Sequence, residues 1–323
     1  MDQPFKDLRL NVKQASEVFS ISRASLYNLE KEHKITFSKE EVGTTTRRFF
    51  TWDDLNQVVR HYSEKIIKPK KKRKVFSNLK GGVGKSTVAC QVAMRASAKG
   101  LKTLVIDLDP QGHTSLAFRV FDPGGPTILD CLIKESNSKD RAPIEDRTVE
   151  VTPFLSVVPS NISLSTGEIK LVADNKRAER LKMLLDSIEH RWDLIIIDTG
   201  PSAGLLNINA FLASDEIVIV TETDFYSVAG LVTFFSIIEE LEDDFGFRPA
   251  IRIVPNRFDI RENSSQEALG ALRANYSEYL TSTVVRKNVD IKEAHKLGTP
   301  IWTYKSKSTG SEDLKSLTDE IIL

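Results

Sequence analysis

Residues 80–87, which read KGGVGKST, combine the residue types with which proteins hold phosphate groups. Glycines let consecutive backbone N–H groups turn toward one anion, Lys85 can reach phosphate oxygens, and the Ser86 hydroxyl can ligate Mg²⁺. The apolar run Val75–Leu79 precedes this loop, and the helix-forming run Val88–Lys99 follows it. Because strand, loop and helix stand in this order, we interpret the stretch as a nucleotide phosphate site and not as a chance glycine-rich turn.

The loop departs from the common pattern G-x-x-x-x-G-K-[ST], because Leu79 occupies the first glycine position and a second lysine, Lys80, follows it. The pattern K-G-G-x-G-K-[ST] resembles the deviant Walker A loop of the ParA/MinD ATPase superfamily. By this resemblance the ligand is ATP with Mg²⁺. The expected nucleotide-binding residues of the loop are Lys80, Gly81, Gly82, Val83, Gly84, Lys85, Ser86 and Thr87.

Two carboxylates follow the next apolar run, in the segment from Asp107 to Gly112 that reads DLDPQG. Acids two residues apart at the end of a strand can address a metal ion and an attacking water, although a simply capped strand end is the alternative. The segment resembles the D-x-D-P-Q motif of ParA proteins. The resemblance implies that Asp109 polarises the water and that Asp107 lies near the metal.

Four apolar residues and an acid, Leu194–Asp198, have the form of a Walker B motif, and Asp198 is expected at the metal beside Ser86. The following loop reads TGPS. The resembled family often has Pro-Pro there, so Gly200 is a departure that loosens the turn. Further on, Asn256 closes a late strand and is expected to pair with adenine, as in the family, unless it only forms a turn.

Lys80 is the residue on which the expected mechanism depends most. In the resembled family this lysine reaches across a nucleotide-sandwich dimer to the phosphates of the partner subunit, where a cation in trans does the work of an arginine finger. We therefore expect an ATP-dependent homodimer in which Lys80, Lys85 and Asp109 are the catalytic residues.

The elements that must position these residues alternate between strand and helix from residue 75 onward, which predicts an α/β fold with a parallel sheet covered by helices on both faces. The expected strands are Val75–Leu79, Thr103–Asp107, Leu155–Pro159, Leu194–Asp198, Ile217–Thr221, Ile251–Val254 and Thr281–Val285. The expected helices are Thr87–Lys99, Ala178–Glu189, Tyr226–Leu241, Ser264–Tyr276 and Glu312–Ile321.

A smaller unit precedes this body. A helical pattern over Val12–Phe19, a short turn, and a helix Arg23–Glu32 capped by Ser22 have helix-turn-helix spacing. Short β-prone pieces around Gly43 and a helix from Thr51 to about Lys65 complete a module that resembles MerR-type winged domains and the N-terminal module of longer plasmid ParA proteins. A helical dimerisation cap is the alternative. The expected DNA contacts are Arg23, Ser25, Tyr27, Asn28, Lys31, Arg47 and Arg48.

We therefore divide the chain into a winged helix-turn-helix domain at residues 1–65, a basic linker at 66–74 and an ATPase domain at 75–323. The first 74 residues carry a net charge of +7 and the remainder −7, so the front of the molecule is suited to a polyanion. The linker is read as a basic hinge along DNA phosphates or as a plain solvated segment. Arg286 and Lys287 near the C-terminus face either DNA or only solvent.

Composition excludes some classes. No apolar run is long enough to cross a bilayer, and nothing at the N-terminus reads as a secretory signal. Cys90 and Cys131 lack metal-ligand spacing, which indicates a reduced, cytoplasmic protein. The acidic stretch Ser311–Leu323 does not form a basic membrane anchor of the MinD kind.

Taken together, these motifs predict a DNA-partition ATPase that associates with the nucleoid, works with a ParB-like centromere-binding partner, and binds its own operator through the N-terminal module. A cargo-positioning ATPase of the same family and a transcriptional repressor that uses ATP only as a ligand remain as alternatives.

Overall fold

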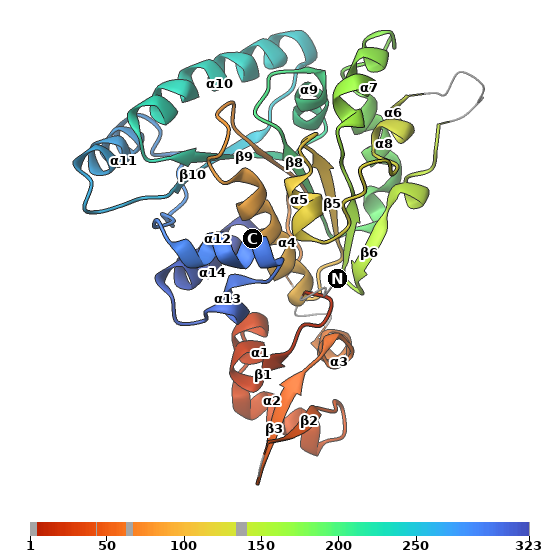
Figure 1. Cartoon of the computed structure of the whole chain (residues 1–323), viewed down its shortest axis with the longest axis vertical. Coiled ribbons are helices and arrows are strands. Elements are labelled where there is room, and N and C mark those ends of the chain that lie inside the picture. The colour runs from red at the N-terminus through yellow and green to blue at the C-terminus, as the bar shows by residue number, and fades with distance from the viewer. Residues whose placement is uncertain (1–4, 43, 63–66, 134–140, 323) are drawn as a thin grey trace.

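A seven-stranded sheet forms the centre of the molecule in the order β10-β9-β4-β8-β5-β7-β6 (Figure 1). The computed structural model describes residues 5–42, 44–62, 67–133 and 141–322. All neighbouring strands are parallel except β6 and β7, which run antiparallel at one edge. The strands are β4 (Arg73–Ser77), β5 (Thr103–Leu108), β6 (Val149–Thr152), β7 (Leu155–Val158), β8 (Leu194–Thr199), β9 (Glu216–Glu222) and β10 (Ala250–Asn256).

Helices cover both faces of this sheet, as the alternating strand and helix patterns predict. One hydrophobic layer joins α4 (Lys85–Ala98), α12 (Val289–Leu297), α13 (Ile301–Tyr304) and α14 (Thr309–Ile322) to the sheet. The opposite layer contains α6 (Leu129–Leu132), α7 (Ser163–Val172), α8 (Arg180–Ile188), α9 (Leu205–Leu212), α10 (Phe225–Phe245) and α11 (Asn263–Asn275). The remaining short elements are α5 (His113–Ala117) and the 3₁₀ turns Ile144–Arg147 and Glu189–Arg191.

The predicted elements differ from the structure in several respects, and some observed elements, among them β6, α7, α9 and α12, were not predicted. The first strand begins at Arg73 and not at Val75, and the strand expected at Thr281–Val285 is absent from the described residues. In that segment the Glu320 side chain accepts hydrogen bonds from the backbone N–H groups of Ser282 and Thr283, at 2.7 and 3.1 Å. Because a side chain satisfies these donors, the segment makes only isolated bridges at either end, through Leu280 and Arg286.

The N-terminal module contains β1 (Leu10–Asn11), α1 (Val12–Phe19), α2 (Arg23–Lys31), β2 (Ser38–Val42), β3 (Thr45–Phe50) and α3 (Trp52–Tyr62). Its three strands form a separate antiparallel sheet, β1-β3-β2. The predicted cap at Ser22 is present, because its side chain accepts a hydrogen bond from Ser25 N at 3.0 Å. At the start of α3, Thr51 Oγ1 donates to Asp54 Oδ2 at 2.8 Å and accepts from Asp54 N at 3.4 Å. The expected end of that helix, near Lys65, lies outside the described residues.

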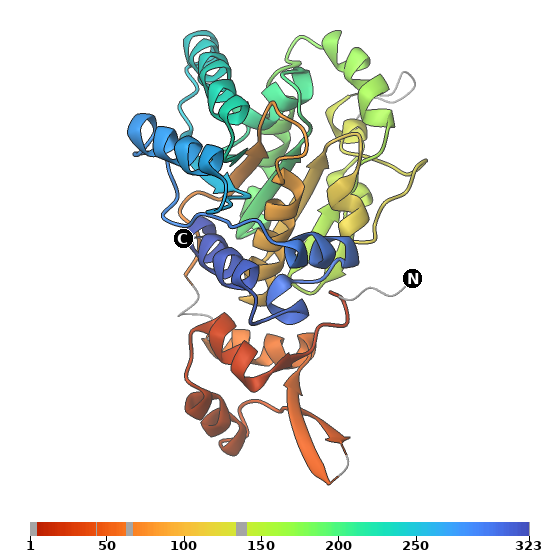
Figure 2. The ribbon, with the colours of Figure 1, turned by 60° about the vertical axis from the view of Figure 1, so that its left-hand side comes forward.

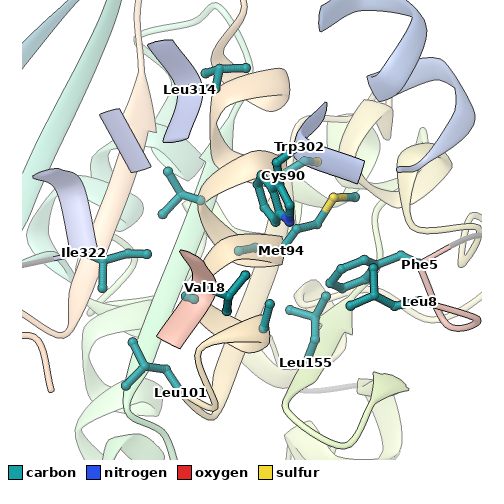
Figure 3. Close-up of a cluster of buried hydrophobic side chains, with 14 of the residues drawn as sticks. Phe5, Leu8, Val18, Cys90, Met94, Leu101, Leu155, Trp302, Leu314 and Ile322 are labelled. Atoms are coloured by element: carbon teal, nitrogen blue, oxygen red, sulfur yellow. The ribbon is translucent and has the colours of Figure 1, made fainter. Parts of the chain in front are cut away.

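The module packs directly onto the larger body at the C-terminal end of α4 (Figures 1 and 2). One hydrophobic cluster contains Phe5 and Val18 of the module together with Met94 of α4 and Trp302 of α13 (Figure 3). Polar contacts join the same surfaces, because Lys315 Nζ donates to Glu17 Oε2 at 2.6 Å. The α4 helix therefore extends from the glycine loop at one end to the module at the other.

The predicted basic linker is shorter than its boundaries of 66–74 suggested. Arg73 and Lys74 belong to β4 and are buried, and Lys74 forms a buried ion pair with Glu216. Arg73 pairs with Asp186 at 2.8 Å and with Glu189 at 2.7 Å. Since acidic partners compensate these two charges, the linker lysines outside β4, at positions 68 and 70–72, are left for a surface role.

Candidate active site

The glycine loop, Lys80–Gly84, joins β4 to the first residue of α4. Gly84 has a φ of 100°, a left-handed conformation that glycine adopts without strain. A Cβ at this position would also lie only 2.5 Å from Nδ2 of Asn256. The first N–H groups of α4 have no intrahelical partner, and the positive end of the helix dipole lies here. The loop and helix thus fit an anion.

Lys85, the first residue of α4, is a buried lysine beside two carboxylates. Burial lowers the pKa of Lys85, and the neighbouring Asp198 and Asp109 oppose that effect. The Lys85 Nζ donates to the carbonyl oxygen of Lys80 at 3.2 Å, which holds the ammonium under the loop. An ammonium in this place can pair with the β- or γ-phosphate of a nucleotide.

Asp107 and Asp198 lie opposite each other on the adjacent strands β5 and β8, and both are fully buried. Asp107 accepts hydrogen bonds from the backbone N and the Oγ of Ser115, at 2.8 and 2.7 Å, and from Asp109 N at 3.1 Å. Burial and the nearby Asp198 raise the pKa of Asp107 to about 8. Both of its oxygens are occupied by protein donors, so a role in positioning its neighbours suits Asp107 better than direct metal ligation.

Asp198 is less completely bonded. Its Oδ2 accepts a hydrogen bond from Thr114 Oγ1 at 2.8 Å, whereas its Oδ1 is buried with no hydrogen-bond partner among the described residues. Burial raises the pKa of Asp198 to about 6, and the Ser86 and Thr114 hydroxyls oppose this rise. A free carboxylate oxygen beside Ser86 fits Mg²⁺, which takes few protein ligands and completes its shell with water and phosphate oxygens. Within the described ranges, no group of three or more His, Cys, Asp or Glu side chains forms a metal cage.

Asp109 lies at the end of β5, where its Oδ1 accepts a hydrogen bond from Gln111 N at 3.0 Å. Gly200 packs against this carboxylate, and a Cβ on Gly200 would stand 3.4 Å from Asp109 Oδ1. This is an ordinary van der Waals distance, so Gly200 lies beside the acid that was predicted to polarise water without being required there by lack of space.

Asn256 closes β10 above the glycine loop. Its Nδ2 donates to the carbonyl oxygen of Val83 at 2.7 Å, and its Oδ1 accepts from Arg257 N at 2.9 Å. Both halves of the amide are engaged with the protein in this structure. The contact to adenine predicted for Asn256 stays a prediction, and the observed contact fixes the loop.

Lys80 points away from the phosphate site of its own chain. Its Nζ donates to Glu222 Oε2 at 2.9 Å, to Asp224 Oδ2 at 2.8 Å and to Ser227 Oγ at 3.0 Å. Partial burial works against the charge, but the hydrogen bonds to Asp224 and Glu222 raise the pKa of Lys80. The loop thus separates its two lysines, with one under the phosphate site and one in an acidic pocket formed by β9 and the start of α10.

Comparison with known proteins decides the family. A family model described as an AAA domain matches residues 71–253. The cell division protein PomZ of Myxococcus xanthus is 32% identical over 254 residues, which cover 78% of each chain. The chromosome partitioning protein ParA of Caulobacter vibrioides is 31% identical over 76% of this chain and 92% of its own length.

This chain belongs to the ParA/MinD family of P-loop ATPases. Its fold agrees with a solved ATP complex of a Cyanothece McdA variant, with a TM-score of 0.68 at 22% identity over 77% of this chain and 95% of that one. The first 70 residues of this ATPase lie outside the family model. In the part of the chain that the structure describes, no helix is long and apolar enough to span a membrane.

Some of the side chains predicted to contact DNA are exposed, and others are bonded to partners within the chain. Arg23, Asn28 and Lys31 of α2 are exposed, as is Arg47 of the β2–β3 hairpin. Ser25 instead shares a hydrogen bond of 2.8 Å with Ser22 at the helix cap.

The other predicted DNA contacts have partners of their own. Arg48 pairs with Glu30 at 3.3 Å and lies 5.6 Å from the centre of the Tyr27 ring. Near the C-terminus, Arg286 forms a two-pronged ion pair with Asp313, at 2.6 and 2.9 Å, so its charge is largely compensated. Lys287 pairs with Glu262 at 3.0 Å.

Sequence reasoning missed four site residues: Thr114, Ser115, Glu222 and Asp224. Thr114 and Ser115 lie two and three residues after the predicted segment DLDPQG, so the signal was a pair of hydroxyl residues shortly after a carboxylate motif. Glu222 and Asp224 lie 142 and 144 positions from Lys80. Acidic residues after a strand are common, and no local pattern connects these two with the glycine loop.

Proposed function

We propose that this ATPase is a DNA-partition ATPase whose ATP-bound form is a homodimer that holds DNA until partner-stimulated hydrolysis releases it. The observation that supports this most strongly is that the two lysines of the glycine loop, Lys80 and Lys85, have different partners. Lys85 lies under the glycine loop, whereas the Lys80 side chain is bound by Glu222 and Asp224 of its own chain. A second subunit would give Lys80 a phosphate to bind.

The chemistry follows from the residues around the loop. Lys85 and the N–H groups of α4 would bind the phosphates, and Ser86 with the unpaired oxygen of Asp198 would hold Mg²⁺. When bound, Mg²⁺ would neutralise negative charge on the β- and γ-phosphate oxygens. Asp109 would orient the attacking water, and Lys80 of the other subunit would stabilise the charge that develops on the transferred phosphoryl group.

DNA binding is proposed for the N-terminal module and for basic surface on the body. In the module, α1 and α2 are separated by three residues and are followed by a hairpin and a third helix, an order that supports the winged helix-turn-helix interpretation. Its exposed side chains Arg23, Asn28, Lys31 and Arg47 would contact an operator. Nucleoid association and a ParB-like partner belong to the same proposal, by analogy with the ParA relatives.

A DNA-binding titration tests this function. The protein would be titrated with an operator fragment and with random DNA, in the presence of ATP, ADP or no nucleotide, at two salt concentrations. Random DNA should be bound only with ATP, and this binding should weaken steeply with salt because phosphate contacts dominate it. Operator binding should persist with ADP. Equal affinity for random DNA under all three nucleotide conditions would contradict the proposal.

A second candidate is a cargo-positioning ATPase of the same family, which moves a protein assembly instead of a plasmid or chromosome; one relative, PomZ, is named a cell division protein and not a partition protein. It predicts the same ATP-dependent dimer and the same binding to random DNA, but no operator footprint. A footprinting experiment on DNA upstream of the gene separates the two, since protection of a defined site is expected only where the module reads sequence.

A further inference from the structure

Thr114 connects the loop after Asp109 to the carboxylate expected at the metal. It is the second residue of α5 and is fully buried. Its Oγ1 donates to Oδ2 of Asp198 at 2.8 Å, although the two residues are 84 positions apart in the chain. The Sγ of Cys90 lies 3.5 Å from the same hydroxyl. Thr114 thus forms a buried hydrogen bond between α5 and the end of β8.

This bond restricts what Asp198 can do. A carboxylate has two oxygens, and the hydrogen bond fixes the side-chain rotation by committing Oδ2 to α5. The remaining oxygen, Oδ1, is buried and unpartnered among the described residues. An unsatisfied buried carboxylate oxygen is costly, so its presence in a well-packed site is explained by a ligand that completes it.

Ser115, the residue after Thr114, also connects α5 to a buried carboxylate. Ser115 holds Asp107 through its backbone N and its hydroxyl, so the first turn of α5 binds both buried carboxylates at the ends of β5 and β8. Ser160 N donates to Ser115 Oγ at 2.9 Å, which fixes this turn from a third side. Asp107 is fully bonded by these contacts, whereas Asp198 keeps one free oxygen. Only the Thr114 side of the turn therefore leaves a carboxylate open to a ligand.

We propose that Thr114 is a positioning residue, which orients Asp198 so that its free oxygen faces the Mg²⁺ of a bound nucleotide, directly or through a metal-bound water. The proposal rests on the nucleotide site proposed above. A purely packing role would require only the shape of the side chain, which valine reproduces without the hydroxyl. Partners that hold a metal-facing carboxylate typically change metal affinity by roughly 10- to 100-fold when they are removed.

The test compares wild type with Thr114→Ser, which keeps the donor, and Thr114→Val, which keeps the shape. Binding of a fluorescent ATP analogue would be measured in EDTA and during a titration with Mg²⁺. In EDTA all three proteins should bind the analogue equally. Thr114→Val should need about tenfold more Mg²⁺ to reach half of the metal-dependent gain, whereas Thr114→Ser should match wild type.

The proposal is overturned if Thr114→Val keeps the wild-type Mg²⁺ midpoint, or if Thr114→Ser shifts it as far as Thr114→Val does. Thermal unfolding in EDTA checks the fold, and Thr114→Ala replaces the valine variant if that variant does not fold. A wild-type protein that binds no analogue with or without Mg²⁺ would instead refute the proposed nucleotide site itself, so the two failures are distinguishable.

Discussion

Lys80 Nζ lies 2.8 Å from Oδ2 of Asp224 in the same chain, and this ion pair places the second lysine of the glycine loop on the side away from its own phosphate site. Asp224 is also the N-cap of α10, where its Oδ1 accepts a hydrogen bond from Ser227 N at 3.1 Å. Glu222 completes the pocket and is shared with Arg257. A lysine that acts in trans must first break these ion pairs. Losing them makes the free energy of dimerisation less favourable.

Replacing Lys80 with alanine should separate nucleotide binding from dimerisation. Lys85 and the N–H groups of α4 remain, so Lys80→Ala should bind an ATP analogue within about threefold of wild type, as expected when a group contributes only in trans. It should no longer form an ATP-dependent dimer on gel filtration. Lys85→Ala is the matched control and should lose nucleotide binding itself. A normal dimer fraction in Lys80→Ala would remove this lysine from the interface.

Weakening the acidic pocket should have the opposite effect. In Asp224→Asn the helix cap is kept, because asparagine caps as well as aspartate, but one charge partner of Lys80 is lost. A partly exposed ion pair is worth up to about 1 kcal/mol, so the ATP concentration needed for half-maximal dimer should fall by up to about fivefold. The double variant with Lys80→Ala should show no such gain. A rise in the required ATP would argue that the pocket supports the dimer instead of competing with it.

The junction between the N-terminal module and the body should be sensitive to one added methyl group. Gly100, which follows α4, has a φ of 83°, and a Cβ there would lie 2.3 Å from Cγ2 of Val59 in α3. Gly100→Ala should therefore destabilise the protein by about 2–4 kcal/mol, from backbone strain together with overpacking. Gly246→Ala is the control, because its φ is 65° but nothing lies within 4 Å of the added atom.

The control variant should lose only about 1 kcal/mol, the strain alone. Denaturant-induced unfolding of both variants and wild type gives the comparison. Equal losses in the two variants would indicate that α3 does not press on Gly100 in solution.

Acid should destabilise the fold through His295, a mostly buried residue on α12. Burial, together with the nearby His113, lowers the pKa of His295 to about 4. The unfolded chain, with a histidine pKa near 6.5, then binds more protons than the folded one below that pH. This contribution to stability is fully present above about pH 6.5 and is lost as the pH falls toward 4.

The expected loss from His295 between pH 7 and pH 5 is about 1–2 kcal/mol. His295→Gln, which cannot titrate, should lose less stability than wild type over this range, as measured by urea unfolding at each pH. His113→Gln is the control that removes the effect of His113 on the pKa of His295. Parallel pH profiles for wild type and His295→Gln would show that folding does not lower the pKa of this imidazole.

Much of the site could be predicted because its residues form short, continuous patterns. The glycine loop, Asp107 and Asp109, and Asp198 each follow a buried apolar run, and the carboxyl ends of parallel strands meet at one edge of a sheet. The expected strands and helices largely agree with the structure for the same reason.

What could not be predicted depends on contacts between distant residues. Nothing local assigns Glu222 and Asp224 to Lys80, or Thr114 to Asp198. The segment Thr281–Val285 has the β-branched composition of a strand, yet Glu320 from α14 satisfies its backbone donors first. Lys74 similarly looked like part of a solvated basic run, and only the position of Glu216 on β9 explains its burial.

Two copies of this chain are proposed to enclose ATP between them. Light scattering during gel filtration, with Mg²⁺ and a non-hydrolysable ATP analogue, measures this directly. A particle of twice the chain mass is expected with the analogue, and a single chain is expected with ADP. A single-chain mass under both conditions, at protein concentrations where the analogue is bound, would contradict the proposal.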